Sequence, residues 1–307
     1  MWKQGLQWRK SQDNIGEPPW DYYFLRNLPE SEYPKYLKKI YNYKTGESLN
    51  LKNPKTFTAK IQWIKLYGIT PLMRDCTDKV KVRNYVKEKI GGEYLKPVIQ
   101  ICNSYDEINF DKLPGGFVIK CSHGCKWQYT VKDKKDYLLT KPFIDITRRN
   151  INGWLEQEFW CFAGFEMQYK NLIPRIIIEP LLREEINTSP REIEVYCFKG
   201  LPKIFENVRY TNKREITYYD ENFNITDLIL NPDDGKNRLI RENADDILKQ
   251  TYDLSKNLAQ DFNFVRVDWI VFNNKLYFNE LTFTPFSGFI ELGKYLNEKL
   301  GSMIELN

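Results

Sequence analysis

Two carboxylates and an arginine near the C-terminus have the spacing of a candidate metal and phosphate site. They lie in a predicted β-hairpin, because apolar and polar residues alternate on both sides of a turn at 273–275. If all three turn residues form the loop, Asp268 lies opposite Glu280, and Arg266 lies opposite Thr282. Two opposed carboxylates repel each other unless a cation lies between them or one is protonated, and Mg²⁺ meets that need in nucleotide enzymes.

Sequence alone leaves the register of this hairpin open. A two-residue turn pairs Asp268 with Asn279 and sends Glu280 to the other face, because a slip of one residue inverts every side chain. The alternative to a metal site is an ordinary hairpin in which Arg266 forms a salt bridge with Glu280. These residues taken alone favour that alternative.

A second group of candidate residues begins near Lys120. The segment 117–120 reads as a buried strand that ends in this lysine, and the small-residue loop 121–125 that follows is suited to fold over phosphates. A solvated charge is the common role of a strand-end lysine, and His123 is a lone imidazole of the kind that is usually packed or hydrogen-bonded. Glu179 ends an apolar strand either as part of a hinge along which an adenine lies or as a cap.

Composition removes several classes of protein. The chain has 307 residues, 42% of them hydrophobic and 28% charged, and no apolar run approaches the ~18 residues of a membrane span. A net charge of +5 without basic blocks suits an anionic substrate and predicts no nucleic-acid partner. One histidine and six cysteines without a CxxC exclude a histidine-rich zinc site and a disulfide scaffold. We expect a cytoplasmic protein without a transmembrane segment.

Periodicity predicts an α+β chain. Helical spacing dominates from about 29 to 100, and short β-rich runs begin near Leu95. We expect helices over 153–170 and about 244–260, and strands at 97–99, 117–120, 174–179, 194–198, 203–209 and 216–219.

The order of these motifs, with Thr77-Asp78-Lys79 ahead of them, resembles the ATP-grasp enzymes, and specifically the TupA-like ATP-grasp family named for teichuronopeptide biosynthesis. The resemblance covers roughly residues 28–307. It is carried by the stretches LNLKNPKTFTAKIQWIKLYG, TDKVKVRNYVKEKIGGEYLKPV, KLPGGFVIKCSHG, NLIPRIIIEPLL, VYCFKGLPKIF and FVRVDWIVFNNKLYFNELTFTPFSGF.

This resemblance implies the ATP-grasp fold, in which two lobes of antiparallel sheet with helices clamp a nucleotide. The expected division is an N-terminal extension at 1–27, a mostly helical N-terminal lobe at 28–100, a small ATP-grasp subdomain at 101–182 and a C-terminal subdomain with the metal hairpin at 183–307.

The resemblance also implies ATP and Mg²⁺ as cofactors, and it assigns roles to particular residues. Expected nucleotide contacts are Lys79, Lys120, His123, Glu179, Leu181, Leu182 and Glu192. The expected catalytic residues are Arg266 and Lys120, and the expected metal ligands are Asp268, Glu280 and Thr282, the last in the place usually held by asparagine.

The implied reaction is ATP-dependent ligation of a carboxylate to an amine through an acyl phosphate. The implied substrates are a small-molecule or glycan-linked carboxylate, such as a uronic acid of bacterial capsule or lipopolysaccharide, and an amine. Alternatives are a sugar phosphotransferase, a glycosyltransferase of polysaccharide assembly and a non-catalytic nucleotide-binding member. Two departures from the family pattern predict a stiffer lid or unusual specificity, because Lys126 and Trp127 replace flexible glycines of the loop and Phe286 replaces a later glycine.

Overall fold

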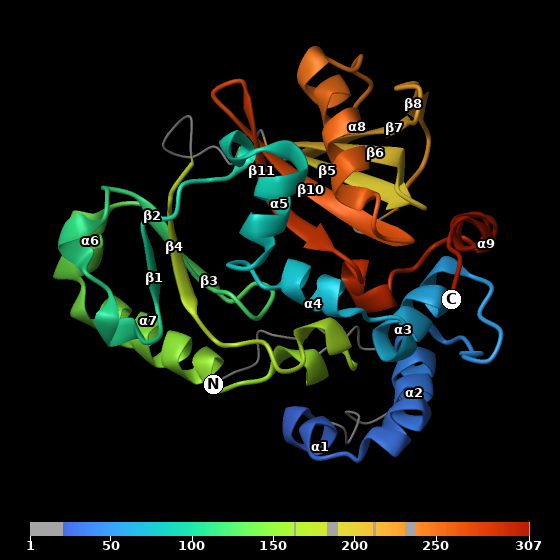
Figure 1. Ribbon diagram of the computed structural model, residues 1–307, viewed down its shortest axis with the longest axis horizontal. Helices are drawn as coiled ribbons and strands as arrows, with labels where there is room; N and C mark the ends of the chain where they lie inside the picture. The colour runs from blue at the N-terminus through green and yellow to red at the C-terminus, as the bar shows by residue number, and fades with distance from the viewer. Residues whose placement is uncertain (1–20, 163, 183–189, 211–212, 231–237, 307) are drawn as a thin grey trace.

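The fold consists of two antiparallel sheets with helices packed around them (Figure 1). The computed structural model describes residues 21–162, 164–182, 190–210, 213–230 and 238–306. Its helices are α1 (Tyr22–Arg26), α2 (Tyr33–Thr45), α3 (Phe57–Tyr67), α4 (Pro71–Thr77), α5 (Val82–Ile90), α6 (Lys134–Leu139), α7 (Lys141–Leu155), α8 (Asp246–Ala259) and α9 (Lys294–Met303). Its strands are β1 (Gln100–Cys102), β2 (Phe117–Cys121), β3 (Gln128–Val131), β4 (Ile176–Pro180), β5 (Arg191–Phe198), β6 (Leu201–Tyr210), β7 (Arg214–Asp220), β8 (Ile225–Thr226), β9 (Arg238–Leu239), β10 (Phe264–Phe272) and β11 (Lys275–Thr282).

The strands divide between a four-stranded and a seven-stranded sheet. The smaller sheet has the order β1-β4-β2-β3, and the larger has the order β11-β10-β5-β6-β7-β8, with β9 added beside β7 in parallel. In Figure 1 the smaller sheet lies at the left with α6 and α7 on its outer side, and the larger sheet lies at the upper right with α8. The expected α+β fold is confirmed.

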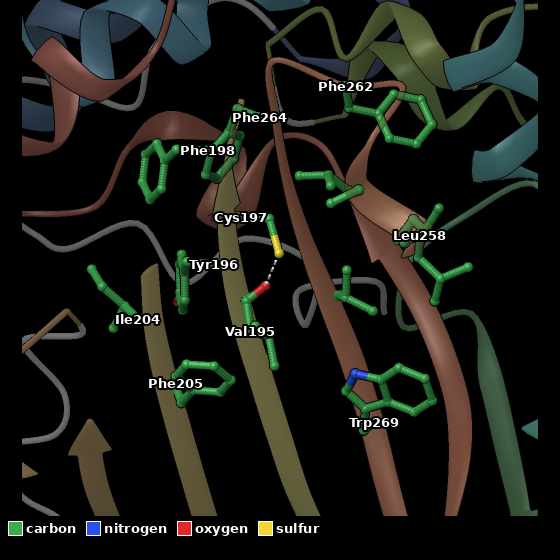
Figure 2. Close-up of a cluster of buried hydrophobic side chains, with 14 of the residues drawn as sticks. Val195, Tyr196, Cys197, Phe198, Ile204, Phe205, Leu258, Phe262, Phe264 and Trp269 are labelled. Atoms are coloured by element: carbon green, nitrogen blue, oxygen red, sulfur yellow. Dashed lines mark hydrogen bonds between the residues drawn. The ribbon is translucent and has the colours of Figure 1, made fainter. Parts of the chain in front are cut away.

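Strict alternation gives each sheet one apolar and one polar face. On β5 and β10 the side chains of Val195, Cys197, Val267 and Trp269 point into the main core, where α8 contributes Leu258. Figure 2 shows Val195, Cys197, Trp269 and Leu258 within this cluster of buried side chains. Because successive strand residues point to opposite faces, the polar residues between them must lie on the other face of the sheet.

The smaller sheet follows the same rule. Phe117, Ile119 and Ile178 point outward into a separate core under α6 and α7. The residues between them on β2 and β4, among them Lys120 and Glu179, therefore share the opposite face.

The N-terminal helices belong to two cores. Thr56 caps α3 and Thr70 caps α4 through side-chain oxygens that accept backbone N–H groups, which explains where both helices begin. Helices α3 to α5 contribute residues such as Ile61 and Val86 to the main core, whereas α1 and α2 pack in a third cluster with Trp160 and Phe165.

Two expected elements are wrong. The helix expected over 153–170 ends at Leu155, after which the chain makes only short 3₁₀ turns, and Phe165 and Asn171 adopt left-handed backbone angles that interrupt any helix. The helix lies upstream instead, because Pro142 in its first turn favours a start there. The strand expected at 97–99 begins later, at Gln100.

Part of the expected extension at 1–27 falls on residues 1–20, which lie outside the described residues. The remainder forms α1, whose Leu25 is buried. Among the helices that the structure describes, none combines the length and the apolar character that crossing a membrane requires.

Candidate active site

Lys120 and Glu179 form a mostly buried ion pair on the inner face of the smaller sheet. The register pairs Val118 with Glu179, so Lys120, two residues farther along β2, lies on the same face. The Lys120 Nζ atom donates to Glu179 Oε2 at 2.8 Å. A second ammonium, that of Lys96, lies 3.3 Å from the same oxygen. Burial alone would raise the pKa of Glu179, but Lys120 and Lys96 outweigh it and lower this pKa to about 2.

Lys79 lies against the expected phosphate loop. Its backbone N–H donates to the carbonyl oxygen of Ser122 at 3.2 Å, and its ammonium donates to the carbonyl oxygen of Gly124. The neighbouring Asp78 is fully buried and bound by Arg175 at 2.8 Å, which fixes the backbone just before Lys79. Lys79 therefore holds the loop, from a position beside the place where phosphates would bind.

The loop from Ser122 to Trp127 is anchored by aromatic packing. The Trp127 ring is parallel to Trp154 at a centroid distance of 6.1 Å and lies so close to Gly124 that a Cβ atom there would come within 2.4 Å of the indole. A glycine is thus required at 124 by the tryptophan, where an ordinary lid would use glycine for mobility.

His123 faces away from the inner side of the sheet. Its ring is buried, its Nε2 atom lies 3.0 Å from the Trp154 carbonyl oxygen, and burial lowers its pKa. The packed, hydrogen-bonded role describes this side chain, so a nucleotide contact from residue 123 would have to come from its backbone.

The hairpin turn differs from the expected three-residue loop. Phe272 pairs with Lys275, which leaves a two-residue turn in which Asn273 and Asn274 both have positive φ. A register shift between Asp268 and Trp269 then places one extra residue, Asn279, in β11 as a bulge. The bulge restores the expected partners that a two-residue turn alone would have lost.

As a result, a row of four carboxylates crosses four neighbouring strands. Asp268 pairs with Glu280 on one side and with Glu194 on the other, and Glu194 pairs in turn with Glu206. Paired residues point to the same face, so all four side chains lie on the inner face of the larger sheet. Burial raises the pKa of Glu194, Arg266 opposes this shift and Glu206 adds to it, and together they bring the pKa to about 8.

Arg266 neutralises part of this row. Its Nε and Nη2 atoms donate to the two carboxylate oxygens of Asp268, each at 2.7 Å, and its Nη1 atom lies 2.8 Å from Glu194. The salt bridge to Glu280 considered above is therefore wrong. Thr282 donates its hydroxyl to Asp268 Oδ2 at 3.1 Å, so it orients this carboxylate.

The remaining expected nucleotide contacts lie just after the end of β4 and near the start of β5. Glu192 is half-buried and accepts a hydrogen bond from the Tyr210 hydroxyl at 3.0 Å. The Leu181 N–H donates to the Gly116 carbonyl oxygen at 3.1 Å, so it is occupied within the sheet, and Leu182 follows as the last residue described before 190.

The two groups of residues come together between the sheets. Lys96, which lies shortly before β1 of the smaller sheet, donates to the bulge residue Asn279 at 2.8 Å. Burial lowers the pKa of Lys120, but Glu179, to which it donates, and to a smaller degree Glu280 raise it above its ordinary value. Sequence reasoning missed Lys96 and Glu194. The alternation of Glu192 and Glu194 along a strand could have indicated the second, whereas a lysine before a proline carries no signal.

The arrangement of two antiparallel sheets with cations on one and carboxylates on the other agrees with a comparison to known families. A family model described as TupA-like ATP-grasp matches residues 59–305. The chain belongs to the TupA-like ATP-grasp family. No curated protein matches it.

Three solved structures are similar to this TupA-like ATP-grasp protein. D-alanine–D-alanine ligase from Bacillus anthracis is 16% identical, covers 81% of this chain and 69% of its own length, and has a TM-score of 0.43. The corresponding ligase from Helicobacter pylori is 16% identical, with 82% and 70% covered and a TM-score of 0.45. The ATP-grasp ligase PsnB, complexed with a minimal precursor, is 12% identical, with 76% and 62% covered and a TM-score of 0.39.

The carboxylate row suits a hard divalent cation that keeps open positions. The Glu280 carboxylate accepts no hydrogen bond from the residues that the structure describes, so its oxygens are free to bind a cation. Burial raises the pKa of Asp268 while Arg266 lowers it and the nearby carboxylates Glu194 and Glu280 raise it, and a cation between Asp268 and Glu280 would relieve that repulsion. Within the described ranges no three His, Cys, Asp or Glu side chains gather closely enough to hold a metal by themselves. Water and phosphate oxygens would complete such a shell, as is usual for Mg²⁺.

Proposed function

We propose that this protein is an ATP- and Mg²⁺-dependent ligase that joins a carboxylate to an amine, with a uronic acid or sugar-linked acid of a bacterial surface polysaccharide as the acid. The observation that carries the proposal is that the Lys120–Glu179 pair of one sheet is joined through Lys96 to Asn279, the residue next to Glu280 in the carboxylate pair of the other sheet. Membership of the TupA-like ATP-grasp family supports it.

The reaction has two balanced steps. An oxygen of the substrate carboxylate attacks the γ-phosphorus of ATP, the bond to the β–γ bridging oxygen breaks, and ADP leaves with that electron pair. The amine nitrogen then attacks the carbonyl carbon of the acyl phosphate, the carbon–oxygen bond to phosphate breaks, and an amide and inorganic phosphate form while the nitrogen loses its proton to solvent.

The residues of the chain divide this work by charge. Lys120 binds the phosphates electrostatically, and Lys79 holds the loop from Ser122 to Trp127 against them. Asp268 and Glu280 would hold Mg²⁺, which when bound neutralises charge on the phosphates. Arg266 donates two N–H groups to Asp268 and forms an ion pair with Glu194, and we assign its remaining donors to an acyl phosphate.

The end of β4 and the start of β5 indicate where the adenine and the ribose would bind. The backbone after Glu179 lies at the end of β4 and Glu192 lies near the start of β5, where a nucleotide held between the sheets would present its base and ribose. We therefore assign Leu181 and Leu182 to the base and Glu192 to the ribose as part of the same proposal.

The test is release of ADP with defined acids and amines. The purified protein is given ATP, Mg²⁺ and pairs drawn from uronic acids and amino compounds, with Glu280→Gln as the inactive variant and the exposed α9 substitution Glu298→Gln as its matched control. We expect ADP and amide only when both an acid and an amine are present, and we expect Glu298→Gln to behave as wild type.

Other results would favour the alternatives. A phosphorylated acceptor formed without any amine would identify a phosphotransferase. Competition of ATP binding by a nucleotide sugar, but not by ADP, would favour a glycosyltransferase. Tight ATP binding without turnover for every pair would contradict the ligase assignment and indicate a non-catalytic member.

A further inference from the structure

Lys96 is a buried lysine between the two sheets that the reaction above does not use. Its residue is 5% exposed. The preceding residue, Leu95, forms a parallel β-bridge with Phe278 of β11, so the backbone at this point is fixed against the metal hairpin. A buried ammonium group needs hydrogen-bond or ion-pair partners that compensate for its loss of water.

The partners of Lys96 come from both sheets. Its Nζ atom donates to Oδ1 of the bulge residue Asn279 at 2.8 Å and lies 3.3 Å from Oε2 of Glu179. Lys120 lies 2.8 Å from that same oxygen. Two ammonium groups therefore share one carboxylate, and the longer distance belongs to the lysine that Asn279 also holds.

This sharing matters when a nucleotide binds. If Lys120 turns toward phosphate oxygens, Glu179 loses its closest cation while it remains buried. A buried carboxylate without a partner is strongly unfavourable, and breaking one side of a buried pair is far more costly than breaking an exposed one. Burial lowers the pKa of Arg83 and Glu179 only partly offsets this, and Arg83 forms no hydrogen bond to that carboxylate in the described part of the chain.

We propose that Lys96 is a positioning residue of the nucleotide site, which keeps Glu179 paired while Lys120 moves from that carboxylate to the phosphates of ATP. The hydrogen bond to Asn279 holds Lys96 in place, so the ion pair with Glu179 persists on either side of the exchange. This inference rests on the proposed function, because it requires that ATP binds at Lys120.

The first measurement is ATP affinity by calorimetry in the presence of Mg²⁺ for wild type, Lys96→Met, Glu179→Gln and the double variant. The exposed α5 substitution Lys87→Met is the matched control for loss of one lysine. We expect Lys96→Met to weaken ATP binding about tenfold or more, since ATP must then draw Lys120 away from an otherwise unpaired carboxylate. We expect the double variant to bind within about threefold of Glu179→Gln, because no carboxylate remains to be compensated.

The ATP affinity of the double variant relative to Glu179→Gln distinguishes a positioning role of Lys96 from direct binding of phosphate. If Lys96 itself bound the phosphates, its loss would weaken ATP binding equally with and without the Glu179 carboxylate. Equal losses in both backgrounds, or unchanged affinity in Lys96→Met, would overturn the inference while leaving the proposed function intact.

A second measurement does not depend on ATP. Urea unfolding of the same four proteins gives the coupling between positions 96 and 179, and it remains informative if Lys96→Met is too unstable for calorimetry, because the double variant carries no unpaired buried carboxylate. We expect the two substitutions to be clearly non-additive. Additive effects would overturn the inference, whereas coupled positions in a protein that fails to bind ATP would place the failure in the proposed function.

Discussion

At the scale of single residues, the two candidate metal ligands are held in opposite ways. Asp268 receives both donors of a bidentate arginine and the Thr282 hydroxyl, so it is part of the folded framework. Glu280 faces it from the next strand without a hydrogen bond from any described residue. The Asp268 carboxylate is therefore held by hydrogen bonds within the protein, whereas the Glu280 carboxylate is available to bind a cation.

This difference predicts different consequences for the two isosteric substitutions. We expect Asp268→Asn and Glu280→Gln each to lower ATP turnover by about 100-fold or more, because each removes charge that would hold Mg²⁺. Only Asp268→Asn should also reduce the free energy of unfolding, by about 1–3 kcal/mol, since it weakens charged hydrogen bonds to buried Arg266. Glu280→Gln should stay within about 0.5 kcal/mol of wild type.

Turnover assays and urea unfolding of both variants check this contrast. Activity retained in both would remove the metal assignment. Equal destabilisation by both would mean that Glu280 has a structural role that the described contacts do not contain.

The same contacts show how far single residues could be predicted from sequence. Strand alternation was enough to bring Lys120 and Glu179 to one face and Asp268 and Arg266 to another, because the period of two fixes the face of every residue once one is known. Lys96 could not be predicted, because its partners Glu179 and Asn279 come from two strands that are distant in sequence.

At the scale of elements, the β10–β11 hairpin reached its expected pairing by a different geometry. The sequence predicted Asp268 opposite Glu280 through a three-residue turn, and the structure achieves it with a two-residue turn and a bulge at Asn279. A bulge leaves no compositional mark, so its position could not be read from alternation. The prediction of a helix over 153–170 was wrong for a related reason. Left-handed backbone angles at non-glycine residues interrupt it, and tertiary contacts rather than local sequence set those angles.

The two-residue turn leads to a prediction at Asn274, which has a φ of 57°. Asn274→Val should lower the free energy of unfolding by about 1–2 kcal/mol, because a β-branched residue is strained in the left-handed region. Asn274→Gly should be neutral or stabilising, since glycine is preferred at this position of such turns. Chemical denaturation of both variants is the measurement, and equal stability of Val and Gly at 274 would indicate the longer loop instead.

At the scale of the whole molecule, the charges of the two sheets oppose each other across the site. The cations Lys79, Lys96 and Lys120 belong to the side of the smaller sheet, and the row from Glu206 to Glu280 belongs to the larger. Glu179 is the anion that keeps the cationic side balanced. Its ionisation should therefore be visible in the stability of the entire protein.

The pKa of Glu179 in the folded protein is about 2, below the ordinary value of 4.5. Between these values the unfolded chain binds more protons, so the stabilisation is complete above about pH 4.5 and is lost as the pH falls toward 2. At about 1.4 kcal/mol per pKa unit it amounts to roughly 3 kcal/mol. Urea unfolding from pH 7 to 2.5 should show a steeper acid loss in wild type than in Glu179→Gln.

The exposed substitution Glu298→Gln is the control for this titration. It should reproduce the wild-type dependence of stability on pH, because the pKa of an exposed carboxylate changes little on folding. Parallel curves for wild type and Glu179→Gln would show that the ion pairs with Lys120 and Lys96 do not stabilise the folded state.

The main core also joins both ends of the chain, which leads to a prediction about independent folding. Ile61 of α3 and Val86 of α5 pack in the same cluster as Val195 and Val267 of the larger sheet, and the Lys60 ammonium donates to the Ile304 carbonyl oxygen at 2.6 Å. A fragment of residues 101–307 would keep every described strand except the first residue of β1, and it would keep α8, but it would expose the part of the apolar core to which α3 and α5 contribute.

We expect this fragment to lose cooperative unfolding, because it retains the backbone pairing of the sheets without the side-chain packing that makes the transition all-or-none. Thermal unfolding followed by near-UV and far-UV circular dichroism, with the full chain as reference, is the measurement. Coincident sharp transitions in the fragment would mean that the helices before residue 101 form a lobe with a core of their own. A broad transition with binding of a hydrophobic dye would mean that those helices complete the main core.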